Sequence, residues 1–223
     1  MGMNATSPWL LLLPLFAACA SAPVPDLALN EELYVDTGYE TKLPGDRTVF
    51  LAPLADVRAE AVKVLEAAAY NGYPIAYDND DRWQRPVAEM VDEIVRREIE
   101  ASYVFTEVVT APAKAQIVVV PKLTSFTTAG IEEVSGGRAL ADVGIQLLVF
   151  GPADAAGKRA TLLDETFIDR KVSEASFRTV SRHVLAGVCL RTVVVKVLQA
   201  LDAKNLGRDG MPGVPETPNY SGN

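Results

Sequence analysis

Residues 75–109 read IAYDNDDRWQRPVAEMVDEIVRREIEASYVFTEVV, a pattern that predicts a short strand, an acidic turn, an amphipathic helix and a second strand. From Pro86 onward, apolar residues recur every three or four positions, the spacing of one helical face. These residues are Val87, Met90, Val91, Ile94, Val95 and Ile99. Pro86 suits the start of a helix, because a proline there removes only an N–H group that has no helical partner. The apolar face of this helix must therefore pack on a sheet.

The rest of the chain predicts further strands and two more helices. Predicted strands cover residues 48–53, 116–128, 139–151 and 159–172, and predicted helices cover 54–70 and 176–201. We expect the last helix to cover the sheet with Phe177, Val180, Val184, Val188, Val195, Leu198 and Leu201. Pro121 lies inside the strand 116–128 and cannot donate a ladder hydrogen bond, so it predicts an edge position or a bulge. An edge strand there would offer a docking rail to a partner strand or to a second copy of the chain.

This order of elements predicts a single α+β domain over residues 47–204. Its sheet should be mixed and mainly antiparallel, with helices packed on one face, giving a two-layer sandwich. The hairpin strand 139–151 alternates apolar and polar residues, as expected for a strand with one buried face. Residues 205–223 are rich in Gly, Pro and polar residues and predict a disordered tail.

The N-terminus has the features of a secretory signal. Residues 1–22 carry no charged side chain, and their apolar run over residues 9–18 is shorter than the roughly 20 residues that span a bilayer. Residues 1–18 therefore read as a signal peptide. Residues 16–19, FAAC, resemble the lipobox of bacterial lipoproteins, in which Cys19 is lipidated and becomes the mature N-terminus. A plain secreted protein and a buried N-terminal helix are the alternatives.

Residues 19–46 read as the lipidated N-terminus and a tether, because they are rich in Pro, acidic residues and turn formers. Tyr34, Val35 and Tyr39 could dock on the domain. Acyl chains contribute about 0.8 kcal/mol per buried methylene, so a lipid anchor would be effectively permanent. Ala20 follows the cysteine, and by resemblance to lipoprotein sorting signals this favours the periplasmic side of the outer membrane. The net charge of -8 argues against nucleic acid as a partner.

The residues that could carry chemistry do not form a catalytic set. His183 is the only histidine, and Cys189 lies in an apolar run where a buried thiol is expected. Asp78, Asp80 and Glu89 have the spacing of three calcium-loop ligands, but Trp83 stands where such a loop requires glycine. Residues 151–158 read as a hairpin turn, since their glycine spacing and Arg159 do not fit a phosphate loop. We therefore expect no enzyme activity, no metal and no cofactor.

Several segments together resemble the ABC-type transport auxiliary lipoproteins, which accompany MCE-type and paraquat-inducible lipid transport systems. They are VFLAPL at 49–54, the unit at 75–109, AQIVVVPKLTSF at 115–126, ALADVGIQLLVFG at 139–151 and the C-terminal helix. Residues 77–86, with Arg82, Trp83 and Pro86, are the most specific part. The resemblance implies a non-enzymatic accessory of an envelope transport complex, with a protein partner and a membrane anchor.

Two functions stay open at this point. The first is the accessory of a lipid transport system, and the second is a regulator or scaffold of peptidoglycan synthesis or other envelope assembly. Arg82, Trp83 and Pro86 are candidate partner contacts. For Trp83 the alternatives are a ring packed at the end of the helix and an aromatic anchor that faces a partner.

Overall fold

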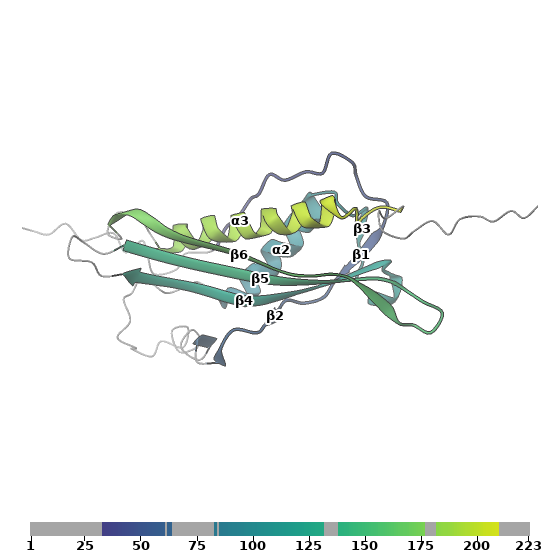
Figure 1. The fold of residues 1–223 in the computed structure, drawn as a ribbon, viewed down its shortest axis with the longest axis horizontal. Coiled ribbons are helices and arrows are strands. Elements are labelled where there is room, and N and C mark those ends of the chain that lie inside the picture. Colours follow the sequence, from purple (N-terminus) through teal and green to yellow (C-terminus); the bar gives the residue numbers. More distant parts are fainter. Residues whose placement is uncertain are drawn as a thin grey trace, which may run out of the picture.

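The computed structural model describes residues 33–60, 62–63, 83, 85–131, 138–176 and 182–209. Their elements are β1 (Thr48–Leu51), β2 (Ala55–Asp56), α2 (Val87–Ala101), β3 (Glu107–Val108), the 3-10 turn η2 (Pro112–Lys114), β4 (Ile117–Ile131), β5 (Arg138–Ala153), β6 (Arg159–Ser176) and α3 (Arg182–Ala203). The six strands form one sheet in the order β3-β1-β4-β5-β6, with β2 also pairing with β4. Both helices cover the same face of this sheet (Figure 1).

The sheet is mixed, and its longest pairs are antiparallel. β1 pairs in parallel with β3 and β4, and β2 pairs in parallel with β4. The long hairpins β4–β5 and β5–β6 are antiparallel. These pairings confirm the predicted α+β sandwich. The predicted strand at residue 75 and the acidic turn after it lie outside the described residues.

Strand β4 corrects the prediction drawn from Pro121. Around Pro121, β4 is not an edge strand, because β5 pairs along one side and β1 and β2 pair with residues 117–123 along the other. The Val119 carbonyl accepts from Ala52 and the Leu123 carbonyl accepts from Val57, so the backbone of Pro121 faces the same side. There it meets the break between β1 and β2, and its missing N–H costs no ladder bond. The edge position and the docking rail are therefore wrong over residues 117–123, while the alternative, a bulge, occurs between Leu123 and Ser125. Among the described strands, β6 has a free edge along its whole length.

A bulge in β4 keeps its apolar residues on the helix-facing side. Leu123 pairs with Ile145 and Phe126 pairs with Val143, although Leu123 and Phe126 are three residues apart. A regular strand would place them on opposite faces. The register shift between Leu123 and Ser125 adds one residue, so both side chains are buried.

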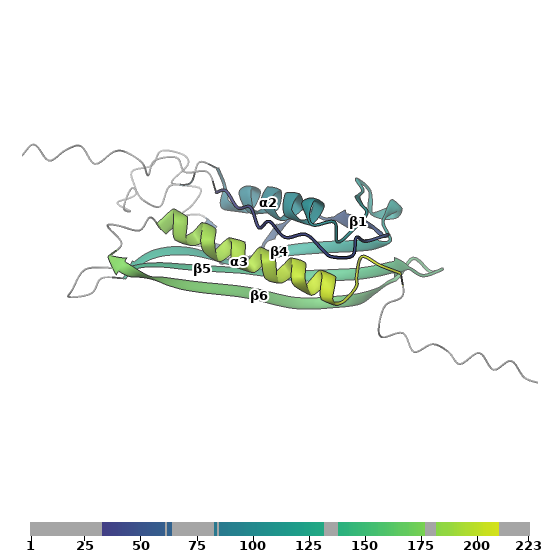
Figure 2. The same ribbon diagram turned by 90° about the horizontal axis from the view of Figure 1, so that it is seen from above.

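Helix α2 confirms the prediction from its spacing. All six predicted apolar residues are buried, and Pro86 is the residue before the first helical turn. Helix α2 lies over the β1 side of the sheet, and α3 lies over β5 and β6 (Figure 2). The helix predicted over residues 54–70 is wrong at its start, because Ala55 and Asp56 form β2. Most of its remaining residues lie outside the described ranges.

Helix α3 differs from its prediction in start and in orientation. β6 continues to Ser176, and the helix begins at Arg182 instead of 176. Val184 and Val188, expected to cover the sheet, are 58% and 44% exposed. The residues that pack on the sheet are Ala186, Cys189, Leu190, Val193, Val194, Val197, Leu198 and Leu201. Phe177 and Val180 lie outside the described residues.

Helix α3 also has the length and composition of a membrane span. It is the one such helix among the described residues, from His183 to Ala203. A core helix meets the same criterion, and α3 packs against β5 and β6 along its length. Its residues at the sheet, such as Cys189 and Leu190, are fully buried. We therefore interpret α3 as the core helix of the domain.

Residues 33–46 form an extended segment, here named the strap, that lies along the seam between α2 and α3 (Figure 2). Its side chains alternate: Leu33, Val35 and Thr37 are buried, whereas Tyr34 and Asp36 are exposed. Val35 thus docks on the domain, as the sequence allowed. This part of the predicted tether belongs to the hydrophobic core.

A buried carboxylate on α2 holds the strap. Glu98 is 5% exposed, and its Oε2 accepts from the Thr37 backbone N–H at 2.9 Å and from the Thr37 hydroxyl at 2.6 Å. Its Oε1 accepts from the Arg97 guanidinium at 3.0 Å. Arg97 also donates to the Val35 carbonyl. A charge this buried is tolerated because it is paired and hydrogen-bonded.

We expect Glu98→Ala to lower the free energy of unfolding by about 1–3 kcal/mol, since the Thr37 N–H and hydroxyl would lose their acceptor inside the protein. Glu100→Ala is the control, because Glu100 is exposed on the same helix and should change stability by less than about 0.5 kcal/mol. Urea denaturation of the two variants measures the difference. Equal midpoints for both variants would show that the Glu98 contact does not stabilise the fold.

Candidate functional site

A groove of about 390 Å³ lies between the start of the strap and the first half of α3. Its walls come from two segments that are distant in sequence, and Trp83 lies between them. The lining residues are Leu33, Tyr34, Val35, Asp36, Trp83, His183, Val184, Gly187, Val188 and Arg191. Most of these side chains are apolar, and Tyr34, Val184 and Val188 are exposed. The groove is therefore a solvent-accessible and mainly apolar surface of the domain.

Trp83 lies at the base of the groove and is 6% exposed. Its ring packs edge-on against Phe126 of β4 at 5.5 Å between centroids and against His183 of α3 at 4.3 Å. Edge-to-face aromatic pairs of this kind contribute about 0.5–1.5 kcal/mol beyond their buried area. Trp83 thus joins the sheet to the start of α3 and belongs to the core cluster.

Of the other sequence-predicted site residues, only Pro86 lies in the part of the chain that the structure describes. Pro86 is exposed at the start of α2. Arg82 and Cys19 lie outside the described residues. The roles of Arg82, Trp83 and Pro86 as partner contacts, and of Cys19 as the lipidated residue, stay predictions.

Charged side chains form the rim of the groove and also hold the strap. The Arg97 guanidinium lies 5.2 Å from the centre of the Tyr34 ring, in the geometry of a cation–π contact. Arg191 on α3 donates to the Thr37 carbonyl at 3.5 Å. Asp36 accepts from the Gly38 N–H at 2.9 Å, which closes a turn of the strap itself. The charges therefore stabilise the walls and leave the floor apolar.

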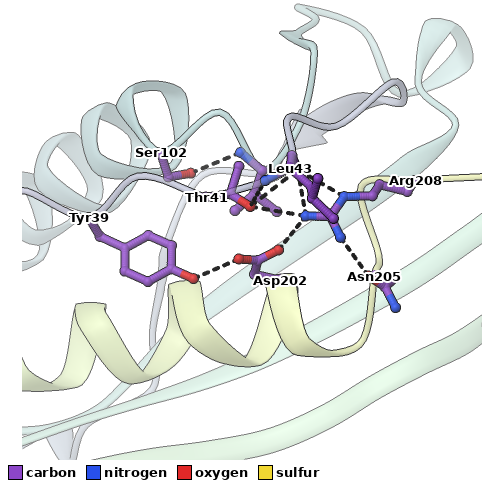
Figure 3. A network of polar contacts seen from close by, with 8 residues as sticks. Tyr39, Thr41, Leu43, Ser102, Asp202, Asn205 and Arg208 are labelled. Atoms are coloured by element: carbon purple, nitrogen blue, oxygen red, sulfur yellow. Dashed lines mark hydrogen bonds and ion pairs between the residues drawn. The ribbon is translucent and has the colours of Figure 1, made fainter.

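The far end of the strap is bound to the end of α3 by the polar network in Figure 3. The Tyr39 hydroxyl donates to Asp202 at 2.8 Å, and burial together with this hydrogen bond raises the pKa of Tyr39 to about 12. Arg208 donates to Asp202 at 2.6 Å and to the Thr41 hydroxyl at 3.0 Å. The Thr41 N–H donates to the Ser102 carbonyl at the end of α2. The strap is thus attached to both helices.

Residues 205–209, which the sequence assigns to the tail, continue this network. Asn205 has a positive φ of 52° and ends the helix, and Leu206 is buried. The Gly207 carbonyl accepts from the N–H groups of Asp46 and Arg47. A Cβ at Gly207 would lie 1.7 Å from the Val104 carbonyl oxygen, so this close approach requires glycine. Asp209 forms an ion pair with Arg47 at 2.7 Å.

Cys189, the other residue that could carry chemistry, is not among the residues that line the groove. Cys189 is fully buried under α3, as predicted, and burial raises the pKa of its thiol to about 11. Among the described residues, no group of three or more His, Cys, Asp or Glu could hold a metal ion. What the groove offers chemically is apolar contact area.

Sequence reasoning missed both the groove and the buried Glu98. The alternation of Leu33, Val35, Thr37 and Tyr39 was a usable signal for an ordered strap, because residues two apart in an extended chain share a face. Glu98 gave no signal, since a glutamate on an amphipathic helix is ordinarily exposed.

Comparisons with known proteins establish the fold. No family model matches the chain, and no curated protein matches it significantly. Protein XCC0632 from Xanthomonas campestris, described with the family model DUF330, is similar with a TM-score of 0.52 and 13% identity over 76% of this chain and 91% of that chain.

Two further structures are more distant. The hypothetical protein CT253 from Chlamydia trachomatis has a TM-score of 0.41 and 12% identity over 71% of this chain and 99% of that one. Lipoprotein GNA1162 from Neisseria meningitidis has a TM-score of 0.29 and 14% identity over 68% of this chain and 98% of that one. Both of these TM-scores are below 0.5. The shared fold is that of XCC0632, at a TM-score of 0.52.

We expect Trp83→Ala to destabilise the domain by about 3–5 kcal/mol, the range for removing a buried large aromatic residue. Tyr34→Ala is the control, because Tyr34 lines the same groove but is 72% exposed, and losing its cation–π contact with Arg97 should cost no more than about 1 kcal/mol. Thermal melts of the full chain measure both variants. A melt of Trp83→Ala that matches the wild type would contradict the core role of this ring.

Proposed function

We propose that this protein is a lipid-anchored lipoprotein on the periplasmic side of a bacterial outer membrane. We propose that it acts there as a non-enzymatic accessory of an ABC-type lipid transport system. The lipobox at residues 16–19 and the resemblance of residues 77–86 to the transport auxiliary lipoproteins support this proposal. The fold shared with XCC0632 is compatible with it.

The observation that carries the proposal is the short distance in sequence between Cys19 and the docked strap. Leu33 is already in the hydrophobic core, and 33 minus 19 leaves 14 residue steps to the anchor. A fully extended chain covers about 3.3–3.6 Å per residue, so the groove end of the domain would lie within about 50 Å of the membrane. A domain held this way suits a role at the membrane surface.

The mainly apolar lining of the groove supports a binding role. Its charged lining residues are Asp36, which accepts from the Gly38 N–H, and Arg191, which donates to the Thr37 carbonyl. A reaction would need a positioned nucleophile or a pair of acid and base groups in the same cleft. A binding or steering role at the envelope needs only an anchor, a rigid domain and a contact surface.

We expect Cys19→Ala to remain in the inner membrane as an uncut precursor or to appear as a soluble species, because the acyl chains would have no thiol to join. Wild-type protein should fractionate with the outer membrane. Mass spectrometry of the mature N-terminus provides the second readout. An unmodified N-terminal peptide that begins at Pro23 in the wild type would contradict the anchor.

Crosslinking in intact cells distinguishes the transport role from the alternative. The wild-type chain should capture a permease, an ATPase or an MCE-type protein, and Cys19→Ala should capture much less of it. Capture dominated by a peptidoglycan synthase would overturn the transport role and favour the regulator of cell-wall synthesis. Cys19 is 14 residue steps before Leu33, so we expect the domain to fold in both proteins and the comparison to test the anchor.

A further inference from the structure

Exposed apolar side chains line the groove between the strap and α3. Val184 and Val188 stand one helical turn apart on α3 and are 58% and 44% exposed. Tyr34 of the strap and the buried Trp83 ring line the same groove. The volume of about 390 Å³ falls in the range of roughly 300–1,000 Å³ that is usual for small-molecule sites.

Three backbone groups of the strap beside the groove, on Val35 and Thr37, are already hydrogen-bonded. The Thr37 N–H donates to Glu98, and the carbonyls of Val35 and Thr37 accept from Arg97 and Arg191. A peptide strand that paired with these strap residues would find their partners occupied. An apolar ligand needs no such partners, so the groove suits a hydrocarbon chain better than a peptide.

The position of the groove indicates where such a chain would come from. The groove lies at Leu33, the first described residue of the strap, which is 14 residue steps from Cys19. If Cys19 is acylated, as the proposed function holds, this end of the domain stays within about 50 Å of a bilayer. A tether of this length keeps the local concentration of membrane lipid high.

We propose that the groove between the strap and α3 binds one acyl chain of a membrane phospholipid. The hydrocarbon would lie on the Trp83 ring, between Tyr34 on one side and Val184 and Val188 on the other. This inference rests on the proposed membrane anchor and adds the class of ligand. It does not require the transport system to be present.

Gly187 allows a variant that fills the groove without removing a core side chain. It lines the groove within α3, and a Cβ placed there would meet only the Tyr34 carbonyl oxygen, at 3.8 Å. Alanine therefore fits, and it favours a helix more than glycine does. Leucine at the same position would extend into the space of the ligand. Gly187→Ala is thus the matched control for Gly187→Leu.

Val188 and Val172 give a second matched pair, because both valines are 44% exposed. Val172 lies on the opposite face of the sheet, since the β6 residues buried under the helices are the odd-numbered Leu163 and Phe167. Val188→Asp should repel an acyl chain from the groove. Val172→Asp adds the same charge at a distance from it.

The test uses the full-length lipidated protein in phospholipid nanodiscs that contain a phospholipid with a photoreactive diazirine on one acyl chain. After illumination, mass spectrometry locates the label. We expect the label at Tyr34, Val184 and Val188. Labelling should fall about tenfold in Val188→Asp, the loss expected from removing the apolar contact of one valine. It should fall to a similar extent in Gly187→Leu, because the leucine side chain occupies the groove. Gly187→Ala and Val172→Asp should label like the wild type.

Three results would overturn the acyl-chain site. They are label spread evenly over the surface, equal losses in Val188→Asp and Val172→Asp, and crosslinks between two copies of the chain at the groove in place of lipid. Melting temperatures within about 3 °C of the wild type show that each variant is folded. Because the assay holds only protein and lipid, failed capture of a transporter in cells would leave its outcome unaffected.

Discussion

The carboxylate of Glu98 is buried on α2 and accepts from both the backbone and the hydroxyl of Thr37. An unpaired carboxylate in this position would be costly, so folding of α2 on the sheet favours the docked strap. The docked strap in turn buries Leu33 and Val35 between the helices and forms one wall of the groove. The contact between Glu98 and Thr37 therefore helps to fix to the core the segment that would lead to a membrane anchor.

The sheet provides the other half of the arrangement. The bulge in β4 brings Phe126 to the helix-facing side, where its ring contacts Trp83. Trp83 then contacts His183 at the start of α3. The groove base is thus joined to the long central strand of the domain. The described helices α2 and α3 make few direct contacts with each other, so these ring contacts help to hold the groove open between α3 and the strap.

Elements with a clear hydrophobic period could be predicted from the sequence, and others could not. In α2, polar residues separate the apolar ones, so the spacing identifies the buried face. In α3, residues 184–190 are apolar or glycine and Val193, Val194 and Val195 follow one another, so the few polar residues between them, such as Arg191 and Lys196, mark the exposed face only weakly. The exposure of Val184 and Val188 could not be predicted for this reason. Pro121 misled because a proline also fits where two short strands meet along one side of a central strand.

The central claim is that the strap is part of the folded domain and not a free tether. Amide hydrogen exchange of the full chain tests this claim at Thr37, Thr41 and Gly45, whose N–H groups donate to Glu98, Ser102 and Tyr103. We predict protection of these three amides comparable to that of α2, because both should open only with the domain itself. Exchange at the rate of an unstructured peptide at these amides, with α2 still protected, would contradict the account.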